Sequence, residues 1–258
     1  MEELAGRVAV VTGSSTGVGR AIALELAAAG ADVCVHCRGR VAAAEQVAEA
    51  VRAQGRNSQV LVADLADRSS HERLVEAAWE WHGGVDIWVN NAGADVLTGD
   101  GRHGSFEDKL DLLWQVDVVG TLRLSRLVGQ RMKRRSVAGE SSLLTIGWDQ
   151  VEHGMAGDSG EMFTAVKGAV MAFTRSLARS LAPQVRVNCL ALGWIRTAWG
   201  EQASEYWQQR AVAETLLGRW GTPQDVARAA RFLASPAAGY ITGQILPVNG
   251  GFRLRDDP

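Results

Sequence analysis

Residues 8–19, VAVVTGSSTGVG, decide the fold of this chain. The first four are apolar and predict a buried strand, and a helix-length amphipathic run follows from Arg20. Between them, Gly13 allows a tight turn, Gly17 lets the backbone approach a pyrophosphate, and Gly19 permits close packing of helix on strand. A glycine triplet also fits a plain turn, but the free N–H groups of a following helix favour phosphate. The segment therefore predicts a strand–loop–helix site for a dinucleotide.

Strand-length apolar runs and helix-length amphipathic segments alternate along the rest of the chain. We expect strands at 8–12, 31–35, 59–63, 85–89, 143–146, 185–190 and 245–248, and helices at 20–28, 41–53, 69–81, 106–135, 161–181 and from 223. This alternation predicts an α/β fold, a doubly wound parallel sheet of Rossmann type with helices on both faces. No linker interrupts it, so residues 1–258 are expected to form a single domain, with a loose tail at 253–258.

Capping residues mark several of the expected helix starts. The N-cap and third-residue spacing fits three pairs, namely Ser69 with Glu72, Ser105 with Asp108, and Thr222 with Asp225. Ser159 is expected to cap the helix at 161–181.

Composition limits the classes of partner. The 258 residues carry 27 basic and 29 acidic side chains, a net charge of −2, with no basic stripe for nucleic acid. No apolar run reaches the ~18–20 residues of a membrane span, and the start of the chain lacks a secretory pattern. Cys34 and Cys37 would point to opposite faces of a strand, so no metal site is predicted. We expect a cytoplasmic protein with a small-molecule substrate.

Further motifs follow the first in a fixed order. VADL occupies 62–65, NNAG 90–93, FTAVK 163–167, GWIRT 193–197 and NGG 249–251. Together with TGSSTGVG, this order resembles the short-chain dehydrogenase/reductases from about Leu4 to Phe252. The resemblance implies hydride transfer with a nicotinamide dinucleotide, and these cofactor-binding residues: Gly13, Ser15, Gly17, Val18, Gly19, Arg38, Asp64, Leu65, Asn91, Ala92, Gly93, Lys167, Gly193, Ile195 and Thr197.

The end of the second expected strand indicates which dinucleotide is bound. An acidic residue there would bind the ribose 2′-OH and repel a 2′-phosphate. Cys37 occupies that place instead, followed by Arg38 and Arg40, and a guanidinium group suits phosphate. The arginines could also be solvated loop residues, but the segment favours NADP(H) over NAD(H).

The catalytic positions depart from the family's pattern. Of the Asn–Ser–Tyr–Lys tetrad that the resemblance implies, only Lys167 is kept, where it would hold the nicotinamide ribose. Phe163 stands at the tyrosine position, Trp148 at the serine position and Asp117 at the asparagine position. A phenyl ring has no proton to give. The chain is therefore expected to be an atypical member that lacks the tyrosine, serine and asparagine.

A substitute proton donor is expected in the loop after the strand at 143–146. Asp149 and His153 lie soonest after that strand, at the sheet edge where ligands bind. A carboxyl group with a raised pKa, or an imidazole, could give the proton. Asp117 could be protonated or could pair with Lys167. Loop acids are also often only solvated, and the sequence leaves these alternatives open.

The tryptophans suggest the kind of substrate. Three of them, Trp194, Trp199 and Trp207, fall in residues 194–221, which are expected to cover a substrate pocket also lined by Trp148 and Phe163. Such rings favour a flat apolar or aromatic substrate, although packing within a lid or interface would explain them equally.

These observations predict an atypical NADP(H)-dependent oxidoreductase that acts on a carbonyl, an alcohol or an activated alkene. Two alternatives stay open: non-redox chemistry on the same scaffold, such as cyclisation, isomerisation or dehydration, and a silent dinucleotide-binding sensor or partner subunit. The resemblance also implies a homodimer or homotetramer through the helices at 106–135 and 161–181.

Overall fold

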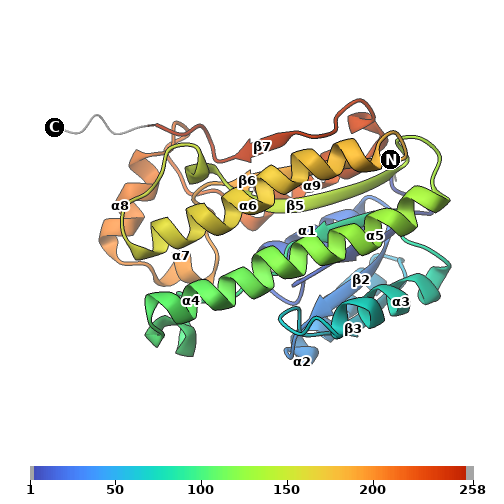
Figure 1. Ribbon diagram of the computed structural model, residues 1–258, viewed down its shortest axis with the longest axis horizontal. Coiled ribbons are helices and arrows are strands. Elements are labelled where there is room, and N and C mark those ends of the chain that lie inside the picture. The colour runs from blue at the N-terminus through green and yellow to red at the C-terminus, as the bar shows by residue number, and fades with distance from the viewer. Residues whose placement is uncertain (1–2, 254–258) are drawn as a thin grey trace.

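A seven-stranded parallel sheet organises the part of the chain that the structure, a computed structural model, describes, residues 3–253 (Figure 1). Its strand order is β3-β2-β1-β4-β5-β6-β7. The strands are β1 (Val8–Val11), β2 (Asp32–Cys37), β3 (Ser58–Val62), β4 (Ile87–Asn90), β5 (Ser141–Trp148), β6 (Val185–Leu192) and β7 (Ile245–Val248). Chain order reverses between β1 and β4, which opens a crevice at the carboxyl ends of these strands.

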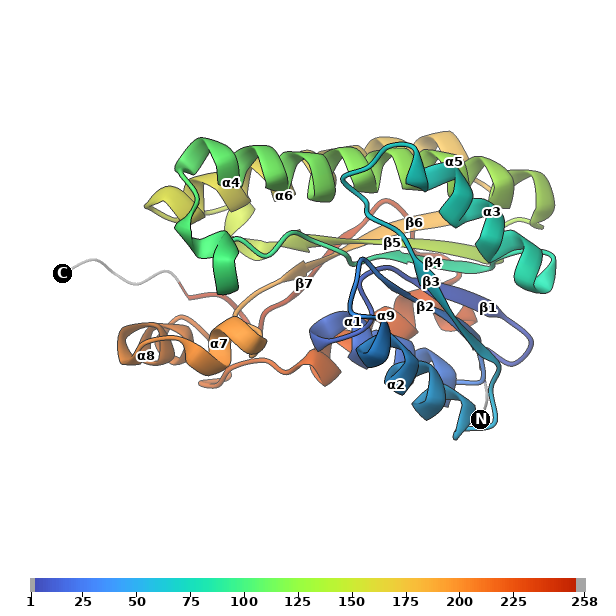
Figure 2. The same cartoon turned by 90° about the horizontal axis from the view of Figure 1, so that it is seen from below.

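Helices cover both faces of the sheet, as Figure 2 shows. One face carries α1 (Gly17–Ala28), α2 (Val41–Arg52) and α9 (Pro223–Ala234), and the other α3 (Ser70–His82), α4 (Phe106–Leu113), α5 (Thr121–Arg135) and α6 (Asp158–Leu181). Beyond the carboxyl ends of the strands, α7 (Ala198–Gln202) and α8 (Glu205–Ala213) form a separate lobe. The doubly wound α/β fold is therefore confirmed.

Two apolar cores lie on opposite faces of the sheet. Alternate residues of each strand enter one or the other, because successive side chains of a strand point to opposite faces. Cys34 packs with the core under α3, α5 and α6, whereas Cys37 packs with the core under α1, α2 and α9. Both thiols are free and buried, so the expected separation of this pair is confirmed.

The capping predictions had mixed outcomes. Capping boxes are present at Ser105 and Thr222. The box predicted at Ser69 was wrong, because Ser69 has helical backbone angles and its hydroxyl donates to Asp67, 2.8 Å away. The cap predicted at Ser159 was also wrong, because α6 already begins at Asp158.

The helical run predicted at 106–135 is continuous but not uniform. A π-helical segment, Trp114–Gly120, separates α4 from α5. Such segments occur often at functional sites, and this one carries Asp117. Of the predicted loose tail, residues 254–258 lie outside the described residues. None of the helices within residues 3–253 combines the length and apolar composition that a membrane span needs.

Candidate active site and cofactor cavity

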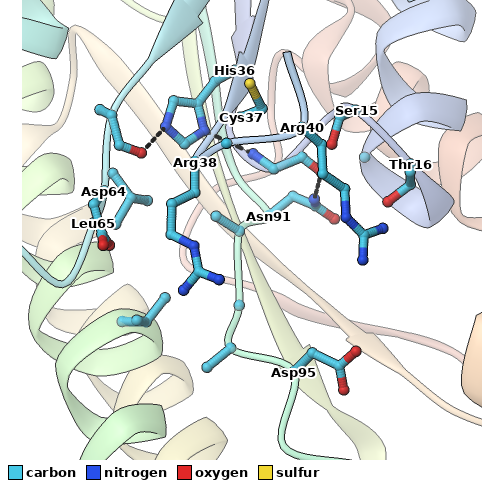
Figure 3. Close-up of a pocket in the computed structure, with 18 of the residues that line it drawn as sticks. Ser15, Thr16, His36, Cys37, Arg38, Arg40, Asp64, Leu65, Asn91 and Asp95 are labelled. Carbon is cyan, nitrogen blue, oxygen red and sulfur yellow. Dashed lines mark hydrogen bonds between the residues drawn. The ribbon is translucent and has the colours of Figure 1, made fainter. Parts of the chain in front are cut away.

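A cavity of about 660 Å³ opens at the carboxyl ends of the strands where the chain order reverses (Figure 3). Its volume is in the range of small-molecule sites. Most of the residues predicted to bind the cofactor line it: Gly13, Ser15, Val18, Gly19, Arg38, Asp64, Leu65, Asn91, Ala92, Gly93 and Thr197. Four other predicted residues, Gly17, Lys167, Gly193 and Ile195, are not part of this lining.

Two glycines let three backbone segments meet at the floor of the cavity. Gly13 has a φ of +63°, and a Cβ there would lie 2.7 Å from the Cα of Ala92. A Cβ on Gly19 would collide with the Gly13 carbonyl oxygen and the Asn91 amide. The turn after β1, the start of α1 and the end of β4 are therefore in contact through backbone atoms, as a pyrophosphate cradle requires.

Side-chain hydrogen bonds fix the turn after β1 to the end of β4. The Thr12 hydroxyl accepts from the N–H groups of Asn91 and Ala92, each at 3.0 Å. The Asn91 amide donates to the carbonyl oxygens of Thr12, at 2.9 Å, and Gly13, at 3.1 Å. The second asparagine of NNAG thus holds the glycine turn in place.

His36 is a further component of the cradle, which sequence reasoning missed. Its ring is 2% exposed; Nδ1 accepts from the Gly13 N–H at 3.0 Å and Nε2 donates to the Ala63 carbonyl at 3.1 Å. Burial lowers the pKa of His36 to about 4, against the opposing effects of the Ala63 carbonyl and Asp64. The neutral ring therefore joins β2 to the turn after β1, which we call the phosphate turn. A polar residue inside an apolar strand was the one signal for it.

The remaining lining supplies groups that fit a phosphorylated dinucleotide. Thr16 precedes α1 without a side-chain cap, so first-turn N–H groups remain for phosphate. Arg38 and Arg40 reach into the cavity from the end of β2 (Figure 3). Among the side chains that the structure describes, Arg38 has no ion-pair partner. The donor set and the cradle together fit a nicotinamide dinucleotide.

Lys167 and Asp117 form an ion pair behind the cavity wall. The Lys167 Nζ lies 2.8 Å from Oδ1 of Asp117, whose side chain is 2% exposed. The second carboxylate oxygen accepts from the Ala94 N–H at 2.8 Å. A Cβ at Gly93 would lie 2.8 Å from Oδ1, so the pair touches the wall of the cavity. Of the two alternatives for Asp117, pairing with Lys167 is the one found.

Trp148 and Phe163, the residues predicted to stand at the serine and tyrosine positions, are two aromatic rings in contact. Trp148 ends β5 and meets Phe163 of α6 edge to face, with ring centroids 6.1 Å apart. Neither ring carries an acidic proton. Two of the five predicted pocket residues thus come together in this pair, and neither lines the cofactor cavity.

The structure separates the two predicted proton donors of the loop. Asp149 is 6% exposed, and its Oδ2 accepts from the Asn249 amide at 3.1 Å. Burial raises the pKa of Asp149 to about 6, although the bond from Asn249 acts in the opposite direction. His153 is exposed and stacks on Phe252 with centroids 4.6 Å apart. Only Asp149 is enclosed at the end of β5.

Comparison with known proteins places this site in a family. The profile described as Enoyl-(Acyl carrier protein) reductase matches residues 13–253. The 3-oxoacyl-[acyl-carrier-protein] reductase FabG of Aggregatibacter actinomycetemcomitans is 35% identical over 250 residues, 94% of this chain and 97% of that one. The chain belongs to the short-chain dehydrogenase/reductase family. Because its relatives are named reductases and dehydrogenases, it is an oxidoreductase of this type.

Solved structures of short-chain dehydrogenase/reductases superpose on the whole chain. A Burkholderia cenocepacia enzyme in complex with NADP is 30% identical, with a TM-score of 0.86 over 96% of this chain and 98% of that one. A 7α-hydroxysteroid dehydrogenase with NADH is also 30% identical, with a TM-score of 0.87 over 97% and 96%. The family therefore binds nicotinamide dinucleotides, in either form.

The lobe of α7 and α8 is built differently from the sheet of this short-chain dehydrogenase/reductase. Trp194 packs against three other tryptophans, Trp199, Trp207 and Trp220, at centroid distances of 5.8–6.3 Å. The Trp194 indole N–H donates to the buried carboxylate of Glu214 at 3.0 Å. These rings fill the lobe and do not line the cofactor cavity. Packing against one another, which was the alternative to substrate contact, therefore accounts for part of the role of these tryptophans.

Proposed function

We propose that the chain is a cytoplasmic NADP(H)-dependent oxidoreductase with a proton donor other than tyrosine. Its substrate would be the carbonyl, alcohol or activated alkene of an apolar or aromatic small molecule. NADP(H), when bound, would supply or accept the hydride. The observation that carries the proposal is the glycine cradle at Gly13 and Gly19 together with Arg38 in the lining of the same cavity. The three free cysteines accord with a reducing compartment.

The preference for NADP(H) rests on charge at the end of β2. Cys37 is buried at the place where an acid would exclude a 2′-phosphate. Burial and the nearby charge of Glu45 both raise the pKa of its thiol, so the side chain is neutral. Arg38 extends into the cavity and has no partner among the described side chains. A planar guanidinium binds phosphate through two parallel hydrogen bonds. The ribose 2′-phosphate is the group that would complete this contact.

The preference for an apolar substrate rests on the aromatic surroundings of the site. Trp148 and Phe163 replace two hydroxyl-bearing positions and contact each other at the end of β5. The tryptophan-rich lobe continues directly from the end of β6, beginning at Trp194. Stacking and apolar contact are what such side chains supply.

The role of Lys167 would be electrostatic and positional. Its side chain is 14% exposed, and its ammonium group is held by Asp117. The carboxylate offsets most of the positive charge that an unpaired lysine would place at the site. An ammonium group has three donors, so the bond to Asp117 leaves two that would serve the ribose hydroxyls.

The test is nucleotide binding followed by turnover. NADPH and NADH are titrated into wild type, Arg38→Ala and the control Arg228→Ala, with nicotinamide fluorescence as the readout. We expect tighter binding of NADPH than NADH in wild type and in the control, and loss of that preference in Arg38→Ala. Turnover is then screened with aromatic ketones, quinones and enones.

Two outcomes would contradict the proposal. Failure of both nucleotides to bind would remove the redox function and the sensor alternative together. Binding of NADPH without oxidation by any of these compounds, together with turnover of a substrate in the absence of cofactor, would favour the non-redox alternative.

We further propose that the chain acts as a homodimer through the rod formed by α4 and α5. Trp114 is 41% exposed near the middle of this rod. Exposed acids, Glu107 and Asp111, lie toward its start, and exposed bases, Arg126 and Arg134, toward its end. In an antiparallel pair each acidic end would face a basic end, and Trp114 would face Arg126 of the second copy.

Charge reversal tests this assembly. Glu107→Arg/Asp111→Arg and Arg126→Glu/Arg134→Glu should each sediment as monomers because like charges then face each other. An equimolar mixture of the two variants should recover dimers. Unchanged sedimentation of both variants, or no recovery in the mixture, would overturn the proposed pairing.

A further inference from the structure

The described structure narrows the choice of proton donor among the ionisable groups near the site. Asp117 has both carboxylate oxygens engaged, one by Lys167 and one by the Ala94 N–H. His153 is exposed and stacks on Phe252. Neither group is placed to give a proton from a water-excluded position. Asp149 is different because it is buried, and only one of its two carboxylate oxygens has a hydrogen-bond partner among the described residues.

Asp149 lies at the carboxyl ends of β5 and β6, next to Gly193 and outside the lining of the cofactor cavity. Trp148, the last residue of β5, pairs with Leu192, the last residue of β6. Asp149 and Gly193 are the residues that follow this pair. A Cβ on Gly193 would lie 3.0 Å from Oδ2 of Asp149, so the absence of a side chain there makes room for the carboxyl group. The same loop continues to Thr197, which lines the cofactor cavity.

The two oxygens of Asp149 have different surroundings. Oδ2 accepts the hydrogen bond from Asn249. Oδ1 is buried and has no hydrogen-bond partner among the described residues. A buried polar atom without a partner is rare and is often found where a ligand or a reaction requires it. Asn249 therefore holds Oδ2 in place, and Oδ1 is left to carry a proton that can be transferred.

We infer that Asp149 is the general acid that protonates the substrate oxygen, a role that rests on the proposed function. As a carbonyl carbon receives the hydride, the Oδ1–H bond of Asp149 breaks and a new O–H bond forms on the substrate. The resulting carboxylate is held by Asn249 and regains a proton from solvent before the next turnover. In the oxidation direction, the ionised carboxylate takes the alcohol proton.

The surroundings of Asp149 suit a group that changes its charge near neutral pH. Burial is the main cause of its raised pKa. Facing it, His153 is the ionisable group whose charge would favour the carboxylate, while Lys167 on α6 is already paired with Asp117. The neighbouring amide of Gln150 is buried, and its nitrogen has no hydrogen-bond partner within residues 3–253. Asp149 thus stays protonated at higher pH than an exposed aspartate.

Cofactor affinity tests the inference without a known substrate. NADP⁺ and NADPH are titrated into wild type, Asp149→Asn and the control Glu152→Gln between pH 5 and pH 8. The oxidised ring is positively charged, so an ionised Asp149 strengthens NADP⁺ binding and leaves NADPH binding unchanged. We expect the ratio of the NADP⁺ dissociation constant to the NADPH dissociation constant to fall about threefold to tenfold as pH rises, in both wild type and control. The ratio should be constant in Asp149→Asn.

Two further variants keep the test decisive. Asn249→Ala removes the hydrogen bond that favours the carboxylate, so the pH midpoint of the ratio should move upward. Asp149→Ser replaces Asp149→Asn if the latter fails to give a native circular dichroism spectrum. The inference is overturned if the ratio does not change with pH in wild type, or if it changes equally in the Asp149 variants. Either result leaves the proposed function standing. Failure of either nucleotide to bind removes the proposed function as well.

Discussion

The glycine cradle at Gly13 and Gly19 and the β5–α6 region around Asp149, where we propose proton transfer, differ in what their geometry permits. In the first, Gly13 and Gly19 are fixed by backbone contacts that leave no space for a Cβ. In the second, Trp148 and Phe163 are side chains on an ordinary strand and helix. Backbone contacts tolerate no substitution, whereas side chains at the end of a strand can be exchanged. Under the proposed function, the cofactor site would therefore persist while the proton donor differs.

Hydrogen bonding shows the same contrast. Around the cradle, Thr12, His36 and Asn91 bond to backbone groups of their neighbours. In the β5–α6 region, Oδ1 of Asp149 and the hydroxyl of Thr164 are buried without partners among the described residues. Unsatisfied groups cost stability, and they are retained where function uses them.

The largest effect is expected from filling the cradle. Gly19→Val places a side chain against the Gly13 carbonyl and the Asn91 amide, so NADPH affinity should fall by more than about 1,000-fold, roughly 4 kcal/mol. Gly39→Ala is the matched control, because Gly39 also lines the cavity but a Cβ there meets nothing within 4 Å. Isothermal titration measures both. Tight binding by Gly19→Val would show that the cradle does not hold the nucleotide.

The next largest effect concerns the proton donor. With any reducible aromatic ketone or quinone, Asp149→Asn should lower kcat by about 10²–10⁴ while NADPH affinity is kept. Adding Phe163→Tyr to that variant should restore at least about tenfold of the loss, because it returns a hydroxyl to the tyrosine position. Stopped-flow NADPH oxidation measures both. An unchanged kcat in Asp149→Asn would move the donor elsewhere.

Acid should loosen the glycine cradle through His36. Its pKa is lowered from 6.5 to about 4 in the folded chain, so the unfolded chain binds the proton first as pH falls. The stability is complete above pH 6.5 and should be lost between pH 6.5 and pH 4, by about 3 kcal/mol. His36→Gln can keep both hydrogen bonds without titrating, so urea unfolding should show no such loss there. Parallel pH profiles would contradict the role of His36.

A smaller effect is expected for the 2′-phosphate contact. Arg38→Ala removes a charge-assisted bidentate contact and should weaken NADPH binding by about 10-fold to 100-fold, or ~1.4–2.8 kcal/mol. NADH binding should stay within about twofold. Arg228→Ala, a solvent-exposed arginine of α9, serves as the control. Equal weakening of NADPH and NADH would show that Arg38 supports the loop and does not bind the phosphate.

The smallest expected effect is on stability in the β5–α6 region around Asp149. The pKa of Asp149 is raised from 3.8 to about 6, so the folded chain keeps its proton longer and stability falls as pH rises between these values. Asp149→Asn has no such loss. Its stability relative to wild type should therefore rise by about 2 kcal/mol between pH 4 and pH 8. Urea unfolding at the two pH values measures this. A loss at pH 8 would indicate that the carboxylate stabilises the fold.

The fold was predictable from the sequence because its signals are local. The strand–turn–helix of residues 8–19 and the capping box at Thr222 depend on neighbouring residues only, and both are found. The box at Ser69 failed because Asp67, two residues earlier, competes for its hydroxyl. Local patterns therefore predict elements well, except where a nearby acceptor offers another hydrogen bond.

The candidate site was only partly predictable, because its chemistry depends on contacts between distant segments. Sequence placed Asp149 and His153 together in one loop, but Asn249, 100 positions away, encloses Asp149, and Phe252 holds His153 at the surface. Likewise His36 reaches Gly13 across the gap between β2 and the phosphate turn. Neither burial nor a hydrogen-bond partner of this kind can be read from residue spacing.

The most direct measurement is a crystal structure of the chain with NADP⁺ bound. We predict the 2′-phosphate on the Arg38 guanidinium, and Asp149 within about 2.6–3.2 Å, directly or through one water, of where a substrate oxygen sits beside the nicotinamide. A tyrosine or serine hydroxyl in that position, or a dinucleotide that does not enter the cradle at Gly13 and Gly19, would contradict the separation of a retained cofactor site from a replaced proton donor.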